Sequence, residues 1–79
     1  MATALQLNLR RALMKAIANQ LETWGKSQQV MAKKLGVSQP RLNVLLKGNV
    51  ESFSLDTLIA IAAKAGLNVR LSAVRKYKT

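Results

Sequence analysis

The side chains best suited to bind another molecule are the amides and cations that follow Ser38. Three leucines in this stretch recur at helical spacing and are expected to face inward: Leu42, Leu45 and Leu46. The polar residues between them are left on or near the outer surface: Gln39, Arg41, Asn43 and Lys47. An amide can bond two atoms of a base edge, and a cation can pair with a phosphate. The pattern therefore predicts a helix that binds double-stranded DNA.

The elements that would position this helix are predicted over residues 27–48 as two short helices joined by a tight turn. Ser27 can cap the first helix, and Gly36 stands where the chain must leave it in a left-handed conformation. Ser38 can cap the second helix, and Pro40 falls in its first turn, where a missing N–H has no intrahelical partner to lose. This geometry allows the second helix to lie in the major groove of DNA.

These residues resemble the helix-turn-helix of the lambda-repressor-like (Xre) family of DNA-binding proteins. The resemblance rests on the following residues: Gln28, Ala32, Leu35, Gly36, Val37, Ser38, Gln39, Leu42, Lys47 and Gly48. It continues through residues 53–58 and 66–69, and this longer pattern is similar to small Xre-type antitoxins of the HigA kind. The resemblance implies a mainly α fold, a lambda-repressor-like helical bundle, and an antitoxin that represses its own operon.

The resemblance also implies roles at the DNA surface. Gln28 would contact a phosphate and brace Gln39, whose amide can read an adenine in an A·T pair. Ser38 and Asn43 are the next candidates for base contact, and Arg41 could reach a guanine or a phosphate. The alternative for each is an ordinary exposed polar side chain.

Further candidates lie around this second helix. Lys47 and Asn49 resemble clamps on the DNA backbone near its end, and Lys33 and Lys34 are candidates for the same role. Pro40 departs from the family pattern, because many members have a polar residue at this place. Its ring could still touch a thymine methyl group.

Length and charge agree with one small DNA-binding domain over residues 1–79. Lysine and arginine number 13 against 3 acids, and the resulting net charge of +10 suits a polyanionic partner. No acid occurs between Glu22 and Glu51, whereas this window contains Lys26, Lys33, Lys34, Arg41 and Lys47. A chain this short buries a thin core, so dimerisation is expected to add to its stability.

The composition argues against an enzyme. The chain has no cysteine and no histidine, and its acids, Glu22, Glu51 and Asp56, offer no evident nucleophile–base pair or metal cage. Neither a metal nor a cofactor is therefore expected. No apolar run approaches the length of a membrane span, and the N-terminus lacks a signal-peptide pattern. These observations predict a cytoplasmic bacterial or phage protein that does not bind a membrane.

One amphipathic helix is predicted before the motif. It ends at Gly25, and its apolar stripe, interpreted as core packing, comprises Leu9, Ala12, Leu13, Ala16, Ile17, Leu21 and Trp24. Three basic residues lie off this stripe: Arg10, Arg11 and Lys15. They form either a solvated face or a set of phosphate contacts.

Another helix is predicted after the motif, in a bundle of about five helices. A loop over residues 48–52 precedes it, since Gly48 and Asn49 both tolerate left-handed backbone angles. Ser54 can cap this helix, and Phe53 and Leu58 have the spacing of a hydrophobic staple across the cap. The helix is expected to close the core and to end at Gly66.

The periodicity then changes from helical to alternating, which predicts a β-strand over residues 67–74. Leu67, Val69, Leu71 and Ala73 would point one way, and the polar residues between them the other. A lone strand cannot satisfy its backbone hydrogen bonds, so the same strand of a second copy, paired about a two-fold axis, is the expected partner. The alternatives are coil packed on the domain or a short further helix.

Two functional interpretations follow for this expected homodimer on a palindromic operator. The resemblance implies an antitoxin whose partner is a small ribonuclease toxin. Such toxins are generally basic, so a chain of charge +10 lacks favourable long-range attraction to one, and binding would depend on an apolar patch that includes Leu5 and Leu7. A phage-type repressor with no toxin partner fits the charge better.

Overall fold

The structure, a computed structural model, describes residues 3–69 of the chain. Within this range the chain is mainly helical. The elements in order are α1 (Ala4–Trp24), α2 (Gln28–Leu35), α3 (Gln39–Leu46), a short 3₁₀ turn η1 (Val50–Ser52) and α4 (Leu55–Lys64). The bundle of about five helices is therefore four α-helices and one 3₁₀ turn over residues 3–69, and a fifth α-helix is not confirmed.

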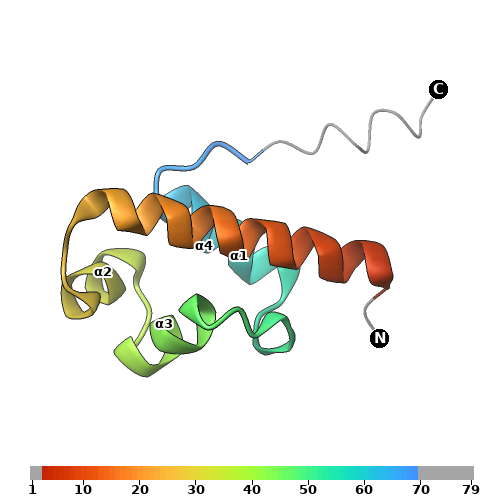
Figure 1. Cartoon of the computed structure of the whole chain (residues 1–79), viewed down its shortest axis with the longest axis horizontal. Helices are drawn as coiled ribbons and strands as arrows, with labels where there is room; N and C mark the ends of the chain where they lie inside the picture. The colour runs from red at the N-terminus through yellow and green to blue at the C-terminus, as the bar shows by residue number, and fades with distance from the viewer. Residues whose placement is uncertain (1–2, 70–79) are drawn as a thin grey trace.

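The long helix α1 spans one side of the molecule, and α4 packs directly against it (Figure 1). The shorter helices α2 and α3 pack against each other and lie together below α1 in this view (Figure 1). Helices α2 and α4 also contact each other. The arrangement therefore presents α2 and α3 as one unit backed by the two longer helices.

Helix α1 begins earlier than its apolar pattern suggests. Thr3 caps it, because the Thr3 hydroxyl accepts a hydrogen bond from the Gln6 backbone N–H at 3.1 Å. It ends at Trp24, and Gly25 follows in a left-handed conformation with φ of 60°, which confirms the predicted end.

The predicted inner face of α1 is wrong at its N-terminal half. Ile17 and Leu21 are buried as expected, and the half-buried Leu13 packs against the core, but Leu9 is half-buried outside the core and Ala12 and Ala16 are exposed. A spacing of four residues advances 400° around a helix of 3.6 residues per turn, so the stripe drifts by about 120° between its first and last leucine. Met14, which the pattern omitted, faces the core instead.

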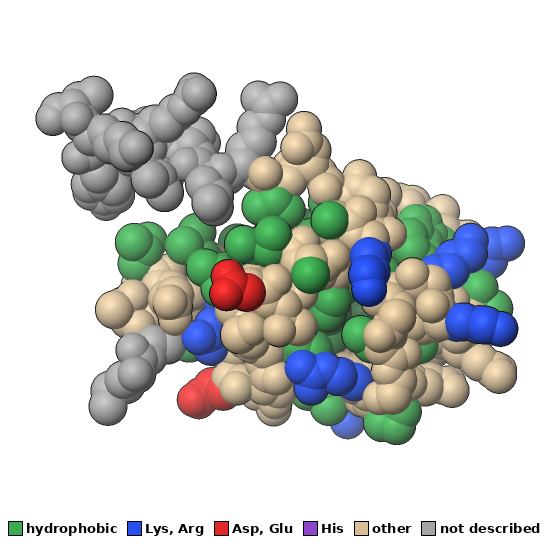
Figure 2. All heavy atoms as spheres, turned by 180° about the vertical axis from the view of Figure 1, so that it is seen from behind, with side chains coloured by type: hydrophobic (Ala, Val, Ile, Leu, Met, Phe, Trp, Pro, Cys, Tyr) green, Lys and Arg blue, Asp and Glu red, His purple; other side chains and the backbone are tan. Residues whose placement is uncertain are grey.

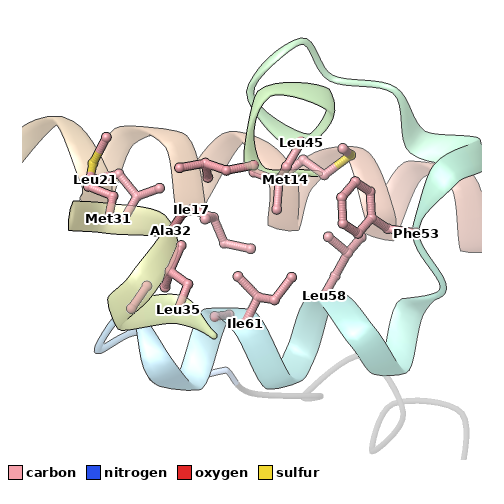
Figure 3. Packing of buried hydrophobic residues seen from close by; sticks show 13 residues of the cluster. Met14, Ile17, Leu21, Met31, Ala32, Leu35, Leu45, Phe53, Leu58 and Ile61 are labelled. Atoms are coloured by element: carbon pink, nitrogen blue, oxygen red, sulfur yellow. The ribbon is translucent and has the colours of Figure 1, made fainter. Parts of the chain in front are cut away.

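The core lies between α1, α2, α3 and α4, and Figure 3 shows its side chains pointing toward one another from these helices. Phe53 and Leu58 are 2% and 0% exposed, so the predicted hydrophobic staple forms across the Ser54 cap. The core as a whole comprises Met14, Ile17, Leu21, Met31, Ala32, Leu35, Leu42, Leu45, Phe53, Leu58, Ile61, Ala62 and Ala65. No polar or charged side chain is buried among residues 3–69, so apolar packing holds this part of the chain together.

The chain after α4 is only partly covered by the structure. Leu67 and Val69 pack against the core and Asn68 is exposed, which agrees with the predicted alternation. Residues 67–69 carry no regular secondary structure, and residues 70–74 of the predicted strand lie outside the described residues. The strand is therefore not confirmed and stays a prediction.

Candidate nucleic-acid interface

Hydrogen bonds at the caps and the turn bring α2 and α3 together. The Ser27 hydroxyl accepts the Val30 N–H at 3.3 Å, and the Ser38 hydroxyl accepts the Arg41 N–H at 3.2 Å, so both predicted N-caps are confirmed. Between the helices Gly36 has a φ of 71°, and the N–H of the next residue, Val37, donates to the Ala32 carbonyl at 3.0 Å. The two helices of eight residues each form a helix-turn-helix.

Helix α3 is anchored by one face and exposed on the other. Leu42 and Leu45 are 0% and 1% exposed, and Leu46 is half-buried, so the predicted inward face is largely confirmed. The side chains left exposed around α3 are those of Ser38, Gln39, Pro40, Arg41, Asn43 and Lys47. The fold therefore brings the predicted base-contacting residues onto the exposed face of one short helix and its N-cap.

The remaining predicted residues flank this helix. Gln28 is the first residue of α2 and is exposed; no hydrogen bond joins it to Gln39 in this part of the chain. Asn49 is exposed in the connection after α3 with a φ of −78°, so of the two residues that tolerate a left-handed angle here, only Gly48 adopts it. Lys33 and Lys34 are exposed in the last turn of α2, away from its N-terminus.

Arg41 makes a contact that sequence reasoning missed. Its guanidinium carbon lies 4.4 Å from the centre of the Phe53 ring, and that ring is otherwise buried. Stacking uses the flat face of a guanidinium and leaves its N–H edges for hydrogen bonds. The adjacency of α3 and the residue before the Ser54 cap arises only in the folded chain, so nothing in the spacing signals it.

Lys34 makes the second such contact, with its ammonium nitrogen 5.7 Å from the centre of the Trp24 ring. The ring belongs to the last residue of α1. This contact directs Lys34 toward the end of α1, whereas Lys33 has no contact of this kind among the described residues.

Arg10 has a structural role rather than a place on a solvated face. Its Nη1 donates to the Val50 carbonyl at 3.3 Å, and its Nη2 donates to the Gln6 side-chain oxygen at 3.0 Å. Its Nε is buried without a hydrogen-bond partner in residues 3–69. Arg10 thereby ties α1 to η1 and positions the connection that leaves α3.

Arg11 and Lys15 extend the basic surface beyond α3. Both are exposed on α1, and together with Leu45, Leu46 and Gly48 they line a shallow hollow beside the end of α3. Lys47, directly before Gly48, belongs to the same neighbourhood in the chain. Arg11 and Lys15 therefore lie near Gly48, the residue that follows the predicted backbone clamp Lys47.

Electrostatics at the helix ends favour an anion near the motif. The first turns of α2 and α3 contain no acidic residue, whereas the first turn of α4 contains Asp56. The unpaired N–H groups at a helix N-terminus carry partial positive charge, which a carboxylate in the first turn would offset. On the face in Figure 2, several basic side chains gather toward the end where α2 lies, and the acidic side chains are separate from them.

Other kinds of site receive no support from the described residues. Residues 3–69 contain no group of three or more carboxylate, thiol or imidazole side chains that could hold a metal ion. None of the helices in this range has both the length and the hydropathy needed to cross a bilayer.

Comparison with known proteins places this geometry in a family. The family model described as a helix-turn-helix domain matches residues 1–74. Comparisons with curated proteins and with solved structures gave no match. Because the family model spans nearly the whole chain, and because α2, the turn and α3 have the geometry that it describes, the chain belongs to this helix-turn-helix family, consistent with an Xre-like, DNA-binding domain.

Proposed function

We propose that the chain is a sequence-specific DNA-binding repressor that acts in the cytoplasm as a homodimer on a palindromic operator. The observation that carries the proposal is the two-sided character of α3. Leu42 and Leu45 hold it to the core, and the amides and the cation of Gln39, Asn43 and Arg41 are all exposed on it. A rigid helix with exposed amides is what direct readout in the major groove requires.

Gln39 and Asn43 are the main base-contacting residues in this proposal. They are four residues apart on α3, so they lie on one helical face, one turn after the other. Each amide can donate to adenine N7 and accept from its N6 amino group. Ser38 accepts the Arg41 N–H and keeps its hydroxyl hydrogen to donate to a base or phosphate, while the ring of Pro40 can meet a thymine methyl.

Arg41 contributes a donor whose position is already restricted. Its stacking on Phe53 limits the side chain before DNA arrives, which reduces the entropy lost on binding. The guanidinium edge can then bond a guanine or a phosphate at the edge of the groove.

The backbone clamps lie on both sides of α3. Gln28 at the N-terminus of α2 supplies one, helped by the free N–H groups of that helix end. Lys47 and Asn49 supply the other, with Arg11 and Lys15 beside them. Lys33 lies at the far end of α2, and Lys34 is engaged with Trp24, so both contribute through charge more than through direct contact.

Dimerisation supplies the specificity that one motif lacks. A single short helix meets only a few base pairs, whereas two copies on half-sites about 34 Å apart read a palindrome. Pairing of the predicted strand over residues 67–74 with its symmetry mate would hold the two copies rigidly, because each strand would satisfy the other's free edge.

Two biological settings suit such a repressor. The resemblance to HigA-type antitoxins supports a protein that also binds a small ribonuclease toxin and represses the operon of the pair. The second candidate, a phage-type repressor with no toxin partner, is favoured by the charge of +10, which would repel a basic toxin. Co-expression with the neighbouring reading frames tests the choice: a stable complex with a toxic ribonuclease supports the antitoxin, and its absence supports the plain repressor.

Selection from random duplexes tests the DNA-binding function itself. We expect the full chain to enrich a palindrome whose half-sites are separated by about one helical turn, 10 to 10.5 base pairs. Affinity for the enriched duplex should exceed affinity for random DNA by about 10³-fold or more at physiological salt. Enrichment of no sequence, or equal affinity for both duplexes, would refute sequence-specific repression.

A further inference from the structure

An apolar groove runs between α1 and α4 at a place that the DNA interface does not use. It is lined by Leu9, Ala12, Leu13, Ala16, Leu55, Ile59, Leu67, Asn68 and Val69. Figure 1 shows α4 behind α1, with residues 65–69 leading away from α4 above α1 in this view, and Figure 2 shows hydrophobic side chains gathered on the corresponding face. Helices α2 and α3 contribute none of the lining, so a molecule bound in the groove leaves α3 uncovered.

The groove is poorly suited to a small ligand. Its volume is about 290 Å³, at the lower limit for small-molecule sites, and Asn68 is its single polar lining residue. Small-molecule sites combine an apolar wall with several convergent polar groups that fix the orientation of the ligand. A second apolar surface is the better match to this lining.

Much of this lining is not needed by the core. Leu9, Leu55 and Ile59 are half-buried without belonging to the core or packing against it, and Ala12 and Ala16 are exposed. Apolar surface left in water is a cost that burial against another molecule would remove. The two alanines, one helical turn apart on α1, would allow a second helix to approach closely.

Charge identifies the partner that this surface fits. The chain carries a net charge of +10, so two copies repel each other wherever their basic side chains face one another. Among the residues that the structure describes, no lysine, arginine, aspartate or glutamate lines the groove. It is therefore a face on which a second copy can approach without bringing cations together.

The position of residues 67–69 also favours a second copy as the partner. Leu67 and Val69 form one wall of the groove, and the alternation that they begin continues in the sequence with Leu71 and Ala73. Strand pairing between two copies would begin at this wall, so the groove and the predicted strand would form one continuous seam.

We propose that the groove between α1 and α4 binds a second copy of this chain, related to the first by a two-fold axis. The two α1–α4 faces close on each other, each burying the other's Leu9 and Ile59, with Leu67 and Val69 at the edge of the seam. The proposal rests on the proposed function, because it supplies the rigid dimer that a palindromic operator requires. In a two-fold interface each residue of the groove faces the same surface of the other copy.

Sedimentation of charge-neutral variants tests the seam. In the double variant Leu9→Gln and Ile59→Gln, two amides would be buried without partners, so the dimer dissociation constant should rise at least about 30-fold. The matched control is Leu5→Gln with Val30→Gln, at the large apolar residues that are 57% and 39% exposed outside the groove; it should leave the constant unchanged. A groove variant that dimerises like the unmodified chain overturns the proposal, as does an unmodified chain that is monomeric.

Cross-linking supplies an independent readout. The chain has no cysteine, so Ala16→Cys introduces a single thiol at an exposed lining position, and Ala63→Cys does so at an exposed position of α4 outside the lining. A short bis-maleimide should join two copies through position 16 and not through position 63. The reverse pattern, or no cross-link at 16 in a dimeric sample, overturns the proposal and assigns the groove to the chain's own following residues or to a different protein.

DNA binding separates the failure of this proposal from failure of the proposed function. The groove double variant keeps the net charge and the whole of α3, so it should bind random duplex DNA with nearly unchanged affinity per protomer while losing operator affinity. Loss of the dimer with random-DNA binding kept supports the seam. An intact dimer that binds operator and random DNA equally contradicts sequence-specific repression and leaves the seam supported by the cross-link.

Discussion

Replacement of Gln39 by alanine gives the sharpest test of the recognition surface. Gln39 is the first residue of α3 and is exposed, and its side chain makes no hydrogen bond within residues 3–69. The change should therefore alter the free energy of unfolding by no more than about 0.5 kcal/mol. Any larger effect on DNA binding must come from contacts with the DNA.

The expected loss follows from the chemistry of one amide. A bidentate contact to a base contributes about 1 to 3 kcal/mol of discrimination per half-site. Two half-sites then lose about 2 to 6 kcal/mol, equivalent to an operator Kd raised about 30-fold to 20,000-fold. Binding to random DNA should hardly change, because it depends on phosphate contacts.

Fluorescence anisotropy with operator and random duplexes measures both quantities. The matched control is Gln29→Ala, which removes the same amide from an exposed position on α2. Lys47→Ala should instead weaken binding to both duplexes alike. Equal losses on operator and random DNA for Gln39→Ala would show that Gln39 only positions the protein, and the base-readout argument would fail.

Three further predictions concern charge, the turn and the C-terminal strand. Operator affinity should fall with salt at a log–log slope of roughly −7 to −11, if each protomer neutralises about 4 to 6 phosphates; a slope near zero in a salt titration would contradict the role of the basic window. Gly36→Ala should cost about 1 to 2 kcal/mol in urea unfolding, and Gly25→Ala about as much, because both have positive φ. The added Cβ at Gly36 meets the flexible Lys64 Nζ at 3.0 Å, so a much larger loss there would mean that Lys64 cannot move. Leu71→Pro should give monomers by light scattering with near-normal helical circular dichroism; a dimer would exclude the strand from the interface.

Local signals predicted the motif well, because caps and turns depend on neighbours in the chain. Ser27, Ser38 and Ser54 cap helices through hydrogen bonds to N–H groups three residues away, and Gly36 adopts the one backbone conformation that ends α2 sharply. These residues place α2, α3 and the outward face of α3 without reference to the rest of the fold. The exposed polar face of α3 could for this reason be anticipated.

Contacts between distant residues could not be anticipated in the same way. The stacking of Arg41 on Phe53 and the hydrogen bond from Arg10 to Val50 join residues that only the packed helices bring together. The pattern also assigned too many residues of α1 to the core, because a four-residue repeat does not show which part of a drifting stripe another helix will cover.

The residue order thus determines α2, α3 and α4, their N-caps and the polar surface of α3, since each depends on interactions over three or four residues. Packing of α1 against α3, η1 and α4 decides the rest. It buries Met14 in place of Ala12 and Ala16, commits Arg10 to the connection after α3, and leaves an uncharged apolar groove between α1 and α4. Such features depend on which faces meet in three dimensions, and a one-dimensional pattern of apolar residues is compatible with more than one way of pairing those faces.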